Sequence, residues 1–80
     1  MTSGELIVNA RMNLHARMII ARETLRSLRL QIQQIESSTQ TPTNEKVLEI
    51  TKIQSEISKV GVEIDSIKKE ITIMNSYRLN

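Results

Sequence analysis

The sequence predicts an all-α fold, an antiparallel helical hairpin in which residues 1–80 form one domain. Three observations predict it: an apolar stripe at helical spacing before residue 37, a second stripe after residue 43, and a polar segment with a proline between them. The expected helices cover about residues 3–37 and 43–78, with a turn at about 38–42. Because the turn is short, the helices should lie side by side in opposite directions.

The first helix is expected to begin at a capping box. Thr2 can accept a hydrogen bond from the amide of Glu5, and the Glu5 carboxylate can accept one from the amide of Thr2. Apolar residues then recur at alternating steps of four and three, and only Arg11 interrupts them. The stripe consists of Ile7, Leu14, Met18, Ala21, Leu25, Leu28, Ile32 and Ile35.

The segment from Ser37 to Thr41 is rich in hydroxyl side chains, which compete with the helix for backbone hydrogen bonds and favour a break. We expect Pro42 at the first position of the second helix and Thr41 as its cap. The second stripe has no polar interruption. It consists of Ile50, Ile53, Ile57, Val60, Ile64, Ile67, Ile71 and Met74.

Folding the chain at the turn places the two stripes against each other, so that Leu14 should meet Ile67. Ala21 should then lie near Gly61. Glycine costs about 1 kcal/mol in a helix interior relative to alanine. We therefore interpret the small pair as a close crossing of the two helices, in preference to a hinge.

The charges on the two sides of this hairpin differ in sign. One side has an acidic row that recurs every seven residues, and Arg17 should face its third member. The row is Glu49, Glu56, Glu63 and Glu70. The other side has a basic stripe with no neighbouring acid from the second helix. The stripe is His15, Arg22, Arg26 and Arg29. When helical hairpins associate side by side, charges on their flanks can determine which partner binds and in which orientation.

Two helices cannot cover all the apolar residues, and Val8, Met12 and Ile19 should form a patch that another chain covers. A chain of 80 residues without cysteine and with one histidine cannot use disulfides or metals for stability, so oligomerisation is expected. Two hairpins could close into a four-helix bundle or build a larger coiled-coil assembly. The expected partner-binding residues are Val8, Met12, Ile19, Arg22, Arg26, Arg29, Glu49, Glu56, Glu63 and Glu70.

The expected function is that of a non-enzymatic structural protein, an assembly subunit or a small chaperone, which binds itself or another helical protein. No catalytic, cofactor-binding or metal-binding residue is expected, and no small-molecule substrate. The alternative is an RNA- or DNA-binding regulator that uses the arginines of the first helix. Eleven basic against nine acidic residues, the acidic row and the single aromatic residue argue against it.

No apolar run approaches the ~20 residues of a membrane span, and no signal peptide is evident, so a cytoplasmic location is expected, with signal-less export as the alternative.

Two long helices joined by a turn that contains a proline resemble the needle subunits of type III secretion systems and their small hairpin chaperones. The resemblance rests on the turn Thr41-Pro42-Thr43-Asn44 and on the later segment 67–71. The arginine-rich first helix and the lack of aromatic residues depart from the needle pattern. No residue's role is carried over.

Overall fold

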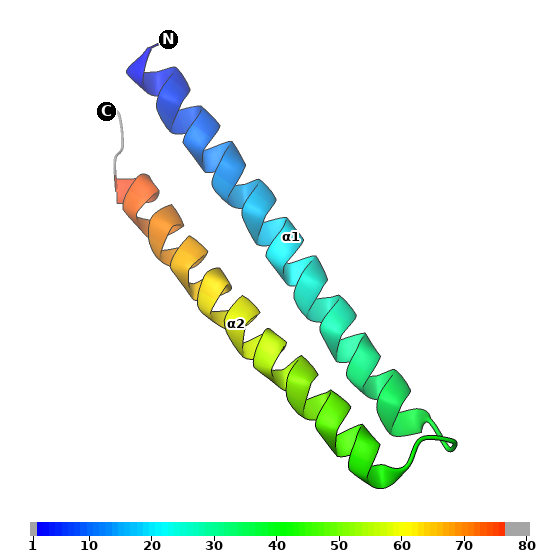
Figure 1. Cartoon of the computed structure of the whole chain (residues 1–80). Helices are drawn as coiled ribbons and strands as arrows, with labels where there is room; N and C mark the ends of the chain where they lie inside the picture. The colour runs from blue at the N-terminus through cyan, green and yellow to red at the C-terminus, as the bar shows by residue number, and fades with distance from the viewer. Residues whose placement is uncertain (1, 77–80) are drawn as a thin grey trace.

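The computed structural model describes residues 2–76. Within this range the chain forms two helices, α1 (Ser3–Ser37) and α2 (Thr43–Ser76), and no strand. They lie side by side in opposite directions, so the start of α1 and the end of α2 share one end of the rod (Figure 1). The all-α hairpin is therefore confirmed. Positions 77 and 78, expected in the second helix, lie outside the described residues.

The expected capping box is present at the start of α1. The hydroxyl of Thr2 accepts a hydrogen bond from the Glu5 amide at 3.2 Å, and Glu5 Oε2 accepts one from the Thr2 amide at 3.4 Å. The Thr2 carbonyl also accepts the first helical hydrogen bond, from Leu6 N at 3.1 Å. Two amides that a helix start would otherwise leave unpaired are thus satisfied by side chains.

The entry to α2 differs from the expected one. The helix begins at Thr43, and Pro42 precedes it: the Pro42 carbonyl accepts from Lys46 N at 3.0 Å. Pro42 therefore occupies the cap position, where its missing N–H costs nothing. The hydroxyl of Thr41 lies 3.0 Å from that of Ser38, so it closes the turn and does not cap the helix.

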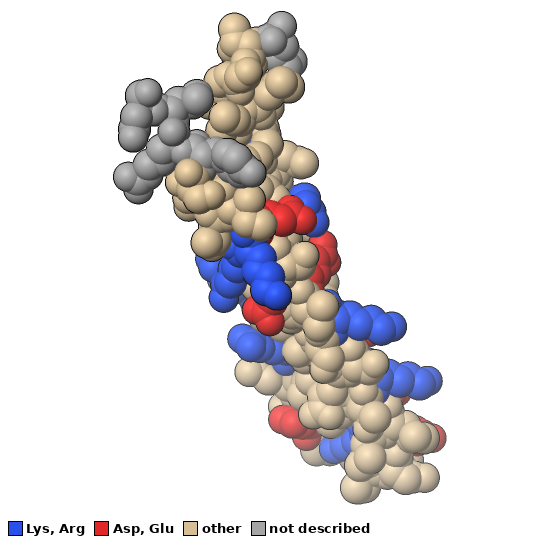
Figure 2. Space-filling model, turned by 90° about the vertical axis from the view of Figure 1, so that its left-hand side faces the viewer, with Lys and Arg blue, Asp and Glu red and all other residues tan. Residues whose placement is uncertain are grey.

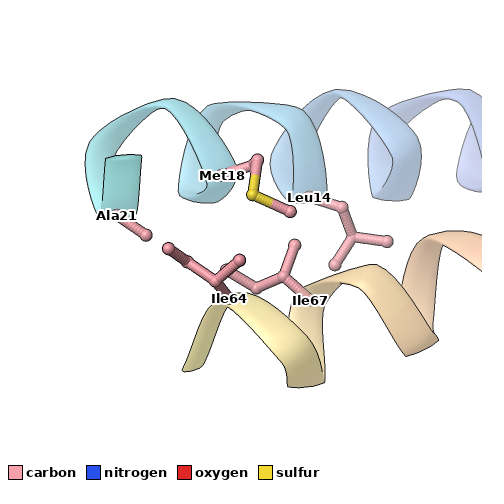
Figure 3. Close-up of a cluster of buried hydrophobic side chains, with 5 residues drawn as sticks. All are labelled: Leu14, Met18, Ala21, Ile64 and Ile67. Atoms are coloured by element: carbon pink, nitrogen blue, oxygen red, sulfur yellow. The ribbon is translucent and has the colours of Figure 1, made fainter. Parts of the chain in front are cut away.

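The core is one cluster in the half of the hairpin that carries the chain ends. Figure 3 shows its side chains pointing from the two helices toward each other, with Ile67 between Leu14 and Met18. Ile67 is 0% exposed, the most deeply buried of the described side chains. The cluster comprises Leu14, Met18, Ala21, Ile64 and Ile67. Leu14 and Ile67 thus lie together, as the predicted register requires.

Outside this cluster Leu28 is also buried, but the other stripe residues are only partly covered, because each helix has a single neighbour. Ile32, Ile50, Ile53 and Ile57 are half-buried. The chain exposes 6339 Å² and measures 60 × 16 × 15 Å. A compact protein of 9.2 kDa would expose about 4,900 Å². The hairpin alone therefore leaves about 1,400 Å² more surface in water than a globular chain of its mass.

Gly61 does not serve a close crossing of the helices, and that interpretation is wrong. A Cβ added to Gly61 would meet no atom within 4 Å. Ala21 is buried in the core cluster against Ile64, one helical turn nearer to the chain end. Gly61 follows the stripe residue Val60, and the rotation of about 100° per residue turns its α-carbon out of the contact. The small residue therefore borders open space.

Candidate interaction surfaces on the two flanks

One flank of the hairpin presents a continuous stripe of α1 that is first apolar and then basic. We name it the basic flank. Its residues recur at steps of three and four beside the core stripe, so they share one side of the helix. All are exposed, Met12 and Ile19 at 65% and 63%. The stripe consists of Val8, Met12, His15, Ile19, Arg22, Arg26 and Arg29.

The three arginines of this flank line a shallow hollow together with Leu25, Leu30 and Gln33. Arg26 approaches Glu23 at 3.9 Å, but both side chains are exposed, so the pair contributes at most about 1 kcal/mol. Arg22 and Arg29 have no ion pair with any described residue. Their charges therefore remain available to an anionic partner.

The opposite side, which carries the acidic row, is the acidic flank. Here Arg17 Nη1 lies 3.2 Å from Glu70 Oε2, so the expected partner, Glu63, is wrong. The reason is the tilt of side chains toward the N-terminus of their own helix. In antiparallel helices this tilt carries Arg17 and Glu70 toward each other and Glu63 away.

Glu49, Glu56 and Glu63 complete the acidic row, and all are exposed. None has an ion pair with a described residue. Lys52 and Lys59 alternate with these glutamates on the same side of α2, although neither forms an ion pair with a described residue. The two flanks thus differ in the sign of their excess charge.

The acidic flank also has a mainly apolar hollow that was not predicted from the sequence. It lies beside the Arg17–Glu70 pair and is lined by Ala10, Asn13, Leu14, Arg17, Glu70, Ile73 and Met74. Ile73 at its rim is 55% exposed. Leu6 and Ile20 lie seven residues before and after Asn13, on the same side of α1, and are 56% and 65% exposed. That seven-residue spacing is the signal that could have identified them.

Charged and uncharged surface are separated along the rod. On the side drawn in Figure 2, lysine, arginine, aspartate and glutamate side chains gather along the middle, with mainly uncharged surface toward the end where α1 begins. Part of this separation recurs on the flanks, although Val47 is exposed near the turn and Lys68 is exposed near the chain ends. The apolar residues Val8, Met12 and Ile19 precede the arginines in α1, and the unpaired glutamates of α2 lie toward the turn.

Chemistry for other classes of site is sparse in residues 2–76. No group of three or more histidine, cysteine, aspartate or glutamate side chains in this range is placed to hold a metal ion. Neither α1 nor α2, as described, combines the length and apolarity that crossing a bilayer requires. In comparisons with known proteins, the chain matches no protein-family model, no curated protein and no solved structure.

Proposed function

We propose that this chain is a non-enzymatic assembly protein that acts by helix–helix contacts with copies of itself or with another helical protein, as an assembly subunit or small chaperone. One observation carries the proposal: large apolar side chains that stay more than half exposed. Those on the two flanks are Leu6, Val8, Met12, Ile19, Ile20 and Ile73. A single exposed apolar residue is ordinary, but a stripe of them marks an interaction surface.

The free energies of burial and of ion pairing indicate different roles for the apolar and the charged residues. Full burial of one valine, methionine or isoleucine side chain contributes about 1.5–3 kcal/mol. An exposed ion pair contributes about 0.2–1 kcal/mol. Val8, Met12 and Ile19 would therefore provide most of the binding free energy. The arginines and glutamates would select the partner and its orientation.

Light scattering over a range of concentrations tests the proposal. The flank variant is Val8→Ser/Met12→Ser/Ile19→Ser, and circular dichroism checks that it stays helical. Its control is Leu48→Ser/Val62→Ser, because these residues are 63% and 71% exposed on the outer side of α2, two residues from the core stripe.

The wild type and the control should exceed the monomer mass as concentration rises, while the flank variant should stay monomeric. A helical wild type that remains a monomer throughout would contradict self-association. A flank variant that associates like the wild type would contradict the assignment of the surface.

The arginine-lined hollow favours a second function, binding of RNA or DNA phosphates by Arg22, Arg26 and Arg29. This second function is tested by measuring the affinity for a nucleic acid at several salt concentrations, for the wild type and for the variant Arg22→Gln/Arg26→Gln/Arg29→Gln. Each phosphate contact should contribute a slope of about −0.7 to −0.9 in a plot of log affinity against log salt. Equal binding by both proteins would rule this function out.

A further inference from the structure

The two flanks carry matching patterns along the same axis. On both, exposed apolar residues occupy the half of the rod that carries the chain ends: Val8, Met12 and Ile19 on the basic flank, and Leu6, Ile20 and Ile73 on the acidic flank. Arg22 and Arg29 on one flank and Glu49, Glu56 and Glu63 on the other form no ion pair with a described residue and lie from the middle of the rod toward the turn, whereas the exposed Lys68 lies in the half that carries the chain ends. The first set is arginine and the second is glutamate, and Lys52 and Lys59 lie one helical turn from Glu56 on the same side of α2. The acidic flank therefore keeps a small excess of negative charge, and the two surfaces are complementary and not identical.

We propose that the basic flank of one hairpin docks on the acidic flank of a second copy in the same orientation, and that α1 of the first lies over the groove between the helices of the second. This rests on the proposed function and names the partner. The arrangement sets apolar half against apolar half and arginine against glutamate. Because the contact joins two different surfaces, each copy keeps one flank free for the next.

The register of the core fixes the position of each charge along the long axis of the hairpin, which we call its height. Ile67 lies between Leu14 and Met18 (Figure 3), which places Glu63 near the height of Ile20. Glu56, seven residues earlier, then lies near the height of residue 27. In a second copy placed at equal height, Glu63 and Glu56 lie within about 3 Å, along the axis, of Arg22 and Arg29 of the first copy.

The side chains also tilt favourably in this contact. The arginines of α1 tilt toward the chain ends and the glutamates of α2 toward the turn, as in the observed Arg17–Glu70 pair. Met12 of the first copy reaches the height of the apolar hollow beside Ile73 of the second. A two-fold contact between two basic flanks would instead set Arg22 against another arginine or against apolar surface. Such a contact leaves the charges unanswered.

Charge reversal on each flank separately tests the docking. The first variant is Arg22→Glu/Arg29→Glu, with glutamate on both flanks, and the second is Glu56→Arg/Glu63→Arg, with arginine on both flanks. All four side chains are exposed, so the hairpin should keep its helicity by circular dichroism. The control is Lys69→Glu, on the outer side of α2 seven residues after Val62.

Sedimentation velocity should show wild-type and Lys69→Glu species that grow beyond two copies with concentration. Each double variant alone should need about tenfold more protein or more to associate, and an equimolar mixture should recover wild-type association. A wild type that stops at two copies, with both variants still dimeric, would overturn the docking and leave the proposed function standing. A mixture that fails to recover would also overturn it. A wild type that never associates would overturn both.

Discussion

Arg11 reaches across the hairpin, and its Nη2 donates a hydrogen bond to the backbone carbonyl of Met74 at 3.3 Å. Met74 lies in the last described turn of α2, which has no basic residue of its own. A cation beside the carbonyl end of a helix is favourable, and this one comes from the neighbouring helix. The Arg11 Nε, however, is buried without a hydrogen-bond partner among the described residues. Arg11 therefore does more than interrupt the first stripe, but at a cost.

Arg11→Leu should leave the free energy of unfolding unchanged or raise it by up to about 1 kcal/mol. Leucine loses the hydrogen bond to Met74, worth about 1.5–3 kcal/mol with a charged donor, but also removes a buried unpaired Nε that costs about 1–3 kcal/mol. It adds apolar contact as well. Urea unfolding at low protein concentration measures the change. Arg11→Ala, which gains no such contact, should be less stable by about 1–2 kcal/mol. If Arg11→Leu instead lowered the free energy of unfolding below that of the wild type, the hydrogen bond to Met74 would outweigh the buried, unpaired Nε.

Gly61→Ala should stabilise the hairpin by about 1 kcal/mol, because alanine restricts the unfolded chain and the added Cβ meets nothing within 4 Å. Thermal melting of dilute protein, followed by circular dichroism, checks the shift. A lower melting temperature would mean that the helices approach each other at Gly61 after all.

Ile64→Asp should unfold the hairpin, because it forces an unpaired carboxylate into the core cluster at a cost of several kcal/mol. Ile57→Asp should cost less, since Ile57 is only half-buried. Ile73→Asp is the matched control: Ile73 is 55% exposed, so helicity should persist. Helical signal equal to wild type in Ile64→Asp would contradict the assignment of the core.

The Arg17–Glu70 pair should show a small coupling free energy in a double-mutant cycle, about 0.2–1 kcal/mol, because both side chains are more than 40% exposed. Arg17→Gln and Glu70→Gln complete the cycle, and added salt should weaken the coupling. The parallel cycle with Glu63→Gln should show none. Coupling to Glu63 in place of Glu70 would restore the partner that the sequence suggested.

The spacing of apolar residues was enough to predict the two helices and the meeting of Leu14 with Ile67, because burial enforces the heptad pattern. It could not predict the partner of Arg17. A heptad projection gives the side of a helix but not the tilt of a long side chain along it. Nor could it predict the space beside Gly61, which depends on a rotation of one residue from the stripe.

On the candidate surfaces, the sequence identified the exposed stripe of Val8, Met12 and Ile19 and both charged rows. It missed the hollow at Ile73, because that hollow is formed by both helices together. Only the register of the folded hairpin brings Ala10 and Ile73 to one rim. The exposed stripes of each single helix were thus predictable, and the hollow between the two helices was not.

We propose that other copies of the chain cover the two flanks. The most direct test is sedimentation equilibrium of the unmodified chain from dilute to concentrated solution. We expect a weight-average mass that rises steadily above the 9.2 kDa of one chain and is lowered by added salt. A helical protein that holds the mass of a single chain at every concentration would contradict it.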